Sequence, residues 1–394
     1  MEGDKIKISI VKPKITKPKV KSKDKPKIKP EGKSKGKPEG KSKKKVENIS
    51  KRKSKKKIGS KSQLRHDLVS GDWVVIAGSR NRRPFDPGKF KPAWTEEEIE
   101  KQSGDKCLFC EPEKSGQKKD VLIYKTIDDD WSLRIFPNKY PAFERPKGGP
   151  IAEYNEGPYY WMDSVGYHEL VVTRDHDEDL SELDPLKVAE VLDAYQTRYL
   201  DLMTKKSINY INIFYNHGPA AGSSIYHPHS QLAAIPVISP YIRLELDGAE
   251  RYFRSKKNCV YCVMLEHELE QKKRIVFQND DFVVFCPFAS RSAFEMWVTP
   301  REHRPYFERS VDAEKVSGGE ALREALRRLN KVLGNPAYNF YLHTSPCDGK
   351  DYRYYHWHIE ILPKTSIWAG FELSTGIEIS TMEPEEAAKR LRNV

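Results

Sequence analysis

The stretch Tyr226-His227-Pro228-His229-Ser230-Gln231 places two histidines two residues apart, directly after a loop of small residues. The loop spans residues 216–224 and follows an apolar segment with strand character, residues 210–215. Because residues i and i+2 share a face in an extended chain, both imidazoles can reach one site, and small residues let backbone amides approach an anion closely. The pattern indicates that one histidine is a ligand or anchor and the other a nucleophile or general base. An isolated pair is equally compatible with two ordinary histidines, so the rest of the chain decides.

The same arrangement occurs a second time in the chain. A Cys-x-x-Cys pair, a strand, a strand with one histidine, a helix, another strand and a His-x-His motif follow in this order twice, with helices predicted at residues 184–204 and 312–332. In a chain without a visible export signal, this pattern favours two zinc sites over structural disulfides. The residues that repeat are Cys107, Cys110, His168, His227 and His229 in the first copy and Cys259, Cys262, His303, His356 and His358 in the second.

The two histidines of the first motif can have different roles. Zinc bound by two thiolates and two imidazoles is a closed, structural type of site. If His227 is a ligand, coordination fixes the backbone and holds His229 against the small-residue loop as a nucleophile. Ser223 or Ser224 and the loop amides could hold a phosphate, and Gln231 could donate a hydrogen bond to a phosphoryl oxygen. The second copy lacks the Gly/Ser loop, so we expect it to be structural, with one active centre per chain.

Charge is distributed unevenly along the 394 residues. Residues 1–62 hold 25 of the 69 Lys and Arg residues and 6 of the 57 Asp and Glu residues, so this segment carries +19 and the remainder −7. The Lys/Pro-rich segment cannot bury enough apolar surface to offset chain entropy, and is predicted to be a disordered tail. The acidic remainder argues against nucleic-acid binding by the whole chain, although the tail alone could bind nucleic acid or acidic surfaces nonspecifically.

The sequence shows no signal for a membrane or for export. No apolar run approaches the length of a membrane span. The N-terminus has neither the apolar core nor the cleavage site of a signal peptide. The expectation is a soluble, cytoplasmic protein without a membrane partner.

From about residue 63 to residue 394, the chain resembles the galactose-1-phosphate uridylyltransferase family of the histidine-triad superfamily. Together, the supporting motifs are more specific than a His-x-His pair alone. The resemblance implies an α+β fold of two tandem histidine-triad-like modules, each an antiparallel sheet with helices packed on it. The expected divisions are the tail (1–62), a catalytic module (63–246) and a second module (247–394). The motifs are residues 216–231, Ser70-Gly71-Asp72-Trp73-Val74-Val75 with Arg80 and Arg83, Phe136-Pro137-Asn138-Lys139-Tyr140-Pro141-Ala142, Gly166-Tyr167-His168-Glu169 and Gly370-Phe371-Glu372.

The resemblance implies a ping-pong transfer of UMP from UDP-glucose to galactose 1-phosphate through a nucleotidyl-histidine at His229. Gln231 and Ser224 would contact the phosphoryl group, and the implied zinc ligands are Cys107, Cys110, His168 and His227. A homodimer is also implied, with hexose contacts that could cross its interface. The remaining implied substrate contacts are Asn216 near the phosphoryl group, Asn138 by the nucleoside, Arg80 and Arg83 by the phosphates, and Phe371 and Glu372 by the hexose.

Two features leave alternatives open. Some family members have an iron-type second site, for which Glu245, His343, His356 and His358 could serve, whereas the intact thiol pair favours zinc held by Cys259, Cys262, His303 and His356. The ending at residues 368–376 resembles a branch that includes ADP-glucose phosphorylases. An ADP-sugar or dinucleoside-polyphosphate phosphorylase with the same covalent step and phosphate as acceptor is therefore a second hypothesis. A zinc-containing nucleic-acid-binding protein that uses the basic tail is the third.

Overall fold

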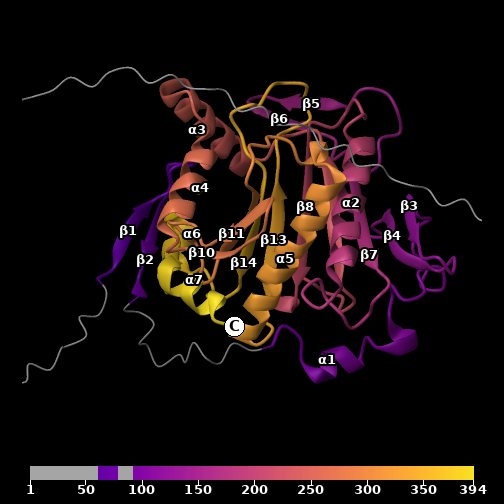
Figure 1. Cartoon of the computed structure of the whole chain (residues 1–394). Coiled ribbons are helices and arrows are strands. Elements are labelled where there is room, and N and C mark those ends of the chain that lie inside the picture. Colours follow the sequence, from indigo (N-terminus) through magenta and orange to yellow (C-terminus); the bar gives the residue numbers. More distant parts are fainter. Residues whose placement is uncertain (1–60, 79–91) are drawn as a thin grey trace, which may run out of the picture. The chain divides into compact units, whose positions relative to one another are not determined.

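The computed structural model describes residues 61–78 and 92–394 (Figure 1). These residues belong to one compact unit. The predicted tail, except for Lys61 and Ser62, lies outside the described residues, and so do Arg80 and Arg83. None of the helices in these two ranges combines the length and the apolar composition that a membrane span requires.

A ten-stranded sheet organises the fold, and every pair of neighbouring strands in it is antiparallel. Its order is β10-β11-β12-β14-β13-β8-β9-β7-β4-β3. The predicted α+β class with antiparallel strands is therefore confirmed. The strands are β3 (Leu122–Lys125), β4 (Trp131–Pro137), β7 (Tyr167–Thr173), β8 (Tyr210–His217), β9 (His229–Ile235), β10 (Ile275–Gln278), β11 (Phe282–Phe285), β12 (Met296–Pro300), β13 (Tyr338–His343) and β14 (His358–Pro363).

The two halves of the chain meet at the centre of this sheet. Five neighbouring strands come from residues 122–235 and the other five from residues 275–363. The central pair is β8 with β13, where His217 lies opposite Tyr338. The predicted boundary between residues 246 and 247 falls inside α3 (Pro240–Lys256). The division into two modules stays a prediction, because both predicted modules contribute to one continuous sheet.

Alternating side chains of the strands face opposite layers of helices, as a two-residue period requires. On β11, Phe282 and Val284 belong to the apolar cluster with residues of α2 (Pro185–Leu202) and α5 (Asp312–Leu333). The side chains between them belong to the cluster with residues of α3 and α4 (Val260–Gln271). Leu232 and Ile359 face the α2 and α5 layer. Both His-x-His motifs therefore direct His229 and His358 away from that layer.

Helices α2 and α5 confirm the two predicted helices and pack against each other. The side chain of Asp184 accepts a hydrogen bond from the Leu186 N–H and caps α2. A Cβ atom on Gly319 of α5 would lie 2.7 Å from the backbone nitrogen of Ala189 in α2. The close crossing of the two helices therefore requires glycine at this position.

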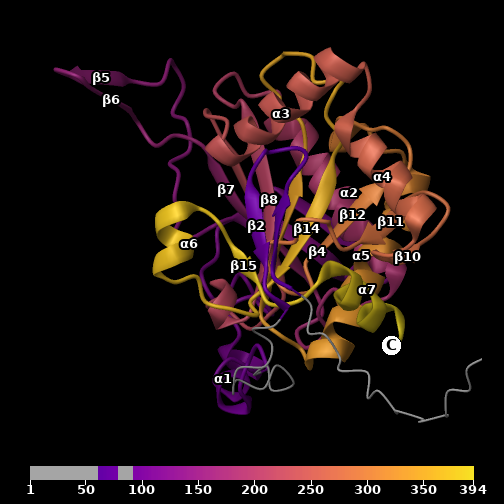
Figure 2. The ribbon, with the colours of Figure 1, turned by 90° about the vertical axis from the view of Figure 1, so that its left-hand side faces the viewer.

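Smaller elements surround the sheet. A second sheet joins β1 (Gln63–His66), β2 (Trp73–Ile76) and β15 (Ile379–Ser380). Figure 2 shows the hairpin of β5 and β6 projecting from the body. The remaining elements are β5 (Glu153–Glu156), β6 (Tyr159–Met162), α1 (Glu96–Glu100), α6 (Gly370–Thr375), α7 (Pro384–Arg392) and 3-10 turns at Gly104–Lys106, Pro219–Ala221 and Phe307–Arg309.

Candidate active site and metal centres

The first pair of thiols meets two imidazoles just before β9. Cys107 Sγ lies 3.3 Å from His227 Nδ1, and Cys110 Sγ lies 3.3 Å from His176 Nδ1. The two Nδ1 atoms are 3.2 Å apart, and all four ligand atoms lie within 4.8 Å of one another. A tetrahedral zinc site with bonds of about 2.0–2.3 Å has ligand–ligand separations of about 3.3–3.8 Å. The spacing and the donor set therefore fit zinc.

A hydrogen bond selects which nitrogen of His227 faces the thiols. Its Nε2 lies 2.8 Å from the carbonyl oxygen of Thr173. Because a carbonyl can only accept, Nε2 carries the ring hydrogen and the lone pair is on Nδ1. Metal-ligating histidines commonly donate their other nitrogen to a carbonyl in this way. Burial lowers the pKa of His227 to about 4, so the ring stays neutral near pH 7.

The structure corrects one member of the predicted ligand set. His168, on β7, does not join the thiols, because its Nε2 lies 2.8 Å from Gln231 Oε1. His176 takes its place from the turn that follows β7. The sequence analysis missed His176 because the repeat directed attention to a histidine within a strand. A signal was present in Arg174-Asp175-His176-Asp177, a polar turn that follows a buried strand.

The second group assembles the four predicted residues Cys259, Cys262, His303 and His356. Cys262 Sγ lies 3.2 Å from His303 Nδ1 and 3.4 Å from His356 Nδ1. Nε2 of His303 donates to the carbonyl of Arg353 at 2.8 Å, and Nε2 of His356 donates to the carbonyl of Pro300 at 3.1 Å. Both rings therefore direct Nδ1 lone pairs toward the thiols, and this donor set also fits zinc.

His229 begins β9 with a defined tautomer. Its Nδ1 donates to the carbonyl oxygen of His227 at 2.9 Å, so the lone pair of the neutral ring is on Nε2. The ring is buried and lies edge-on to Phe109, with ring centroids 5.1 Å apart. Burial lowers the pKa of His229 and favours the neutral imidazole. A neutral ring with a free Nε2 lone pair is suited to nucleophilic attack.

Two predicted substrate ligands, Gln231 and Asn138, lie beside His168. Nε2 of His168 is 2.8 Å from Gln231 Oε1 and 3.4 Å from Asn138 Nδ2. Asn138 Oδ1 accepts the backbone N–H of Tyr140 at 2.9 Å. Gln231 follows His229 by two residues on an extended strand, so the two side chains share a face.

The small-residue loop turns tightly between β8 and β9. Gly218 and Gly222 have φ values of 84° and 91°, where glycine is favoured, and a Cβ on Gly218 would lie 2.8 Å from Ala93 Cβ. Ser223 is buried and donates its hydroxyl to the Ile225 carbonyl at 2.9 Å. Ser224 is exposed, so its hydroxyl is the more accessible of the two.

Three other predicted substrate ligands are held by a side-chain hydrogen bond or lie apart. Asn216 Oδ1 accepts the Nδ2–H of Asn339 at 2.8 Å, which links β8 to β13. Phe371 and Glu372 lie on the exposed helix α6, where Glu372 Oε2 accepts the Ala369 N–H at 3.1 Å. Among the described contacts, none joins α6 to the residues around His229 within this chain.

A third group, Glu245, His343, His358 and Glu360, is buried under α3. His343 Nδ1 lies 3.2 Å from Glu245 Oε1, and His358 Nε2 lies 3.6 Å from Glu360 Oε1. The predicted iron-type alternative is not assembled as proposed, because His356 faces the thiols of the second group and Glu360 completes this one. Burial acts to raise the pKa of Glu360, but Arg291, His343 and His358 together outweigh burial and hold the pKa below its usual value.

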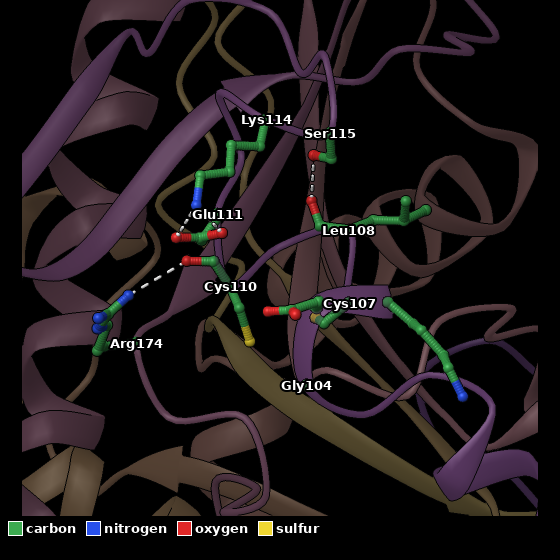
Figure 3. Close-up of a pocket in the computed structure, with 10 residues that line it drawn as sticks. Gly104, Cys107, Leu108, Cys110, Glu111, Lys114, Ser115 and Arg174 are labelled. Carbon is green, nitrogen blue, oxygen red and sulfur yellow. Dashed lines mark hydrogen bonds and ion pairs between the residues drawn. The ribbon is translucent and has the colours of Figure 1, made fainter.

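A cavity of about 800 Å³ opens beside the first Cys/His group (Figure 3). Its basic side chains are partly neutralised, since Lys114 pairs with Glu111 at 2.7 Å and Arg174 with Asp130 at 3.6 Å. The cavity gives solvent access to the Cys107 and Cys110 side of the site. Its lining residues are Gly104, Asp105, Lys106, Cys107, Leu108, Cys110, Glu111, Lys114, Ser115 and Arg174.

Comparison with known proteins gives the same family from sequence and from structure. Residues 51–238 match the model of the galactose-1-phosphate uridyl transferase N-terminal domain, and residues 165–393 match a domain of unknown function. An ADP-glucose phosphorylase of Arabidopsis thaliana is 33% identical over 335 residues, which cover 84% of this chain and 93% of the relative. A galactose-1-phosphate uridylyltransferase of Thermotoga maritima is 25% identical over 339 residues, which cover 84% and 98%.

Solved structures agree with these relatives. An ADP-glucose phosphorylase from Arabidopsis thaliana with bound ADP-glucose has a TM-score of 0.72 and 30% identity, covering 85% of this chain and 99% of that chain. A uridylyltransferase structure has a TM-score of 0.64 and 27% identity, covering 84% and 97%. The chain belongs to the galactose-1-phosphate uridylyltransferase family.

Proposed function

We propose that this enzyme transfers a nucleotidyl group from a nucleotide sugar to a phosphate-bearing acceptor, with His229 as the nucleophile. The observation that supports this most directly is the hydrogen bond from His229 Nδ1 to the His227 carbonyl, which leaves the Nε2 lone pair for a substrate. The carbonyl that accepts this hydrogen bond belongs to His227, whose imidazole faces the thiols of Cys107 and Cys110. The nucleophile is therefore held by a part of the chain that a metal would make rigid.

The reaction has two half-reactions, and each forms one bond to the α-phosphorus and breaks another. In the first, Nε2 of His229 attacks the α-phosphorus of the donor, and the bond to the bridging oxygen breaks, so the sugar 1-phosphate leaves with the electron pair. In the second, an oxygen of the acceptor phosphate attacks the same phosphorus, and Nε2 leaves with its electron pair. Hydrogen-bond donors of Gln231 and Ser224 stabilise the phosphoryl oxygens in both transition states.

For the substrates we propose UDP-glucose as donor and galactose 1-phosphate as acceptor. The matched uridyl transferase domain and the similarity to the Thermotoga maritima uridylyltransferase support this pair. ADP-glucose with phosphate as acceptor is the second candidate. It is favoured by 33% identity to the Arabidopsis thaliana ADP-glucose phosphorylase and by the similar structure with bound ADP-glucose.

The proposal includes two zinc ions per chain and a homodimer. Cys107, Cys110, His176 and His227 would hold one zinc ion, and the second Cys/His group the other. In both places zinc supplies a fixed tetrahedral geometry and not a reacting ligand. Exposed apolar side chains around α6, including Phe371, 47% exposed, and Leu373, 73% exposed, support a partner at this surface. Phe371 and Glu372 would then reach the hexose in the partner's site, while Arg80, Arg83, Asn138 and Asn216 contact the donor.

Formation of the covalent intermediate tests the nucleophile. The full-length enzyme is incubated with UDP-glucose or ADP-glucose labelled in the α-phosphate, and acid-labile label on the protein is measured. The wild type should be labelled by one of the donors, and His229→Ala should not. His267→Ala on the exposed face of α4 is the matched control and should be labelled normally. Labelling of His229→Ala at the wild-type level would assign the nucleophile elsewhere.

A further inference from the structure

His168 holds a position that the zinc assignment does not use. It lies on β7 beside β9, where Leu170 is paired with Gln231. Residues 168 and 170 share a face of the strand, so His168 is a diagonal neighbour of Gln231, within reach of a long side chain. The imidazole is only partly buried, and its side-chain hydrogen-bond contacts, Asn138 and Gln231, are neutral amides. The role of His168 therefore depends on the hydrogen bonds that it makes.

The contacts of His168 determine its tautomer. The backbone N–H of Ala142 donates to Nδ1 at 3.2 Å. A backbone N–H can only donate, so Nδ1 is the acceptor and the hydrogen of the neutral ring is on Nε2. Nε2 then donates to Gln231 Oε1, which lies at 2.8 Å. Asn138 Nδ2, at 3.4 Å from the same Nε2, is also a donor and cannot be the partner of that hydrogen.

This hydrogen bond orients the carboxamide of Gln231. A carboxamide can present either its oxygen or its NH2 group to a ligand. The NH2 group donates to a phosphoryl oxygen, whereas the amide oxygen repels it. With Oε1 occupied by His168, the NH2 group of Gln231 is the part left for the substrate. Asn138 is oriented in the same sense, because its Oδ1 already accepts from Tyr140.

We infer that His168 is a positioning residue, which orients the Gln231 amide so that its N–H groups donate to the phosphoryl group at His229. The inference rests on the proposed function and identifies the residue that prepares the site for an anionic group. Without His168, the amide is free to rotate and present its oxygen to the phosphoryl oxygens, which repels them. The effect is expected on the transfer step more than on binding, since charge on these oxygens is stabilised most in the transition state.

The test compares His168→Leu, Gln231→Leu and the double variant in single-turnover labelling by the α-phosphate-labelled donor. Loss of one preorganised donor slows such a step by roughly 10²-fold, so we expect this for Gln231→Leu and at least about tenfold for His168→Leu. The double variant should be no slower than Gln231→Leu, because His168 acts through that amide. His168→Gln, whose NH2 group can replace Nε2–H, should recover part of the rate. Donor affinity and zinc content should change little in all four.

Three outcomes separate the inference from the function on which it rests. If the wild type is labelled and His229→Ala is not, but His168→Leu reacts at the wild-type rate, or the two leucine effects multiply, the role of His168 is refuted and the function stands. If no donor labels the wild type, the function fails, and nitrogen NMR of histidine-labelled protein still decides the contact. The His168 signal, assigned by its loss in His168→Leu, should show a hydrogen on Nε2 that is perturbed in Gln231→Leu. A hydrogen on Nδ1 overturns the inference.

Discussion

The two His-x-His motifs hold their histidines by the same hydrogen bonds and differ in what surrounds them. His227 donates to the Thr173 carbonyl and His356 to the Pro300 carbonyl, each from Nε2. His229 Nδ1 donates to the carbonyl two residues before it at 2.9 Å, and His358 does the same at 3.1 Å. Both motifs therefore hold their histidines by the same hydrogen bonds, and these bonds alone do not make a histidine a nucleophile.

The difference lies in the residues around the second histidine of each motif. Gln231 lies opposite Phe214, and Glu360 lies opposite Tyr341, so the neutral amide and the carboxylate occupy corresponding places. Two residues further along β8 and β13 are Asn216 and His343. The first half thus surrounds its histidine with neutral amides, while the second surrounds His358 with the buried carboxylates of Glu245 and Glu360, and Glu360 contacts Arg291. Neutral amides can donate hydrogen bonds to a phosphate, whereas the carboxylate of Glu360 is already paired with Arg291.

The largest expected contrast between the halves is between His229→Ala and His358→Ala. The first variant removes the proposed nucleophile and should lower nucleotidyl transfer by a factor on the order of 10⁴–10⁶. The second removes a buried ring that donates to the His356 carbonyl, and should destabilise the fold by roughly 1–3 kcal/mol without removing the covalent intermediate. Transfer assays and urea unfolding of both variants measure the contrast. Loss of labelling in a folded His358→Ala would contradict it.

Metal content distinguishes His168, near the start of β7, from His176, in the turn that follows this strand. His176→Ala should lose one zinc per chain, because its Nδ1 lies 3.3 Å from Cys110 Sγ. His168→Ala is the matched control and should keep both ions. Quantification of zinc and iron per chain after dialysis against a mild chelator checks this, and Cys259→Ser should lose the other ion. If His176→Ala kept the full amount of zinc per chain, another residue would have to be the fourth ligand.

Glu360→Gln makes the second half resemble the first at one position. The change removes the Arg291–Glu360 pair but leaves Glu295, whose Oε1 lies 3.9 Å from Arg291 Nε, so the cost should lie below the roughly 3–5 kcal/mol of a buried pair broken outright. The free energy of unfolding in urea measures this cost. Glu386→Gln, which breaks an ion pair of 2.9 Å between half-exposed side chains on α7, should change stability by less than about 1 kcal/mol. No labelling at His358 is expected when Glu360→Gln is combined with His229→Ala.

The smallest expected effect concerns His217, where the two halves meet. Burial lowers the pKa of His217 and outweighs the Asp179 carboxylate and the hydrogen bond from Nε2 to Asn335 Oδ1 at 2.7 Å, which both raise it, so the native state favours the neutral ring. The unfolded chain binds a proton below about pH 6.5 while the native state resists it, so this part of the stability is present above pH 6.5 and is lost as pH falls. Unfolding free energies between pH 7.5 and 5 should show a shallower slope in His217→Gln. Equal slopes would exclude His217 as the source.

Sequence reasoning succeeded where the chemistry lies in consecutive residues. The alternation that makes β9 extended also puts His229 and Gln231 on one face, and the caps of α2 are encoded by Asp184-Pro185. The Cys-x-x-Cys pairs predicted two groups of thiols and imidazoles, because each knuckle brings its own two ligands. The second group then has all four predicted members.

The other site residues could not be predicted, because they depend on which turns approach each other in three dimensions. His176 reaches Cys110 across 66 positions of sequence, and the polar turn that carries His176 gives no sign of which thiols it approaches. The buried group of Glu245, His343, His358 and Glu360 draws on three elements that periodicity cannot place side by side. The roles of Arg80 and Arg83 belong to residues outside the described part of the chain.

The central pairing of β8 with β13 makes the two halves dependent on each other for solubility. A fragment that ended after β9 would expose the unpaired edge of β8 and the face of α2 that α5 covers. Such an edge offers a row of free backbone N–H and C=O groups to other chains and promotes aggregation. The enzyme is therefore expected to fold as a single cooperative unit, and insertions should be tolerated in the projecting β5–β6 hairpin far better than a break between the halves.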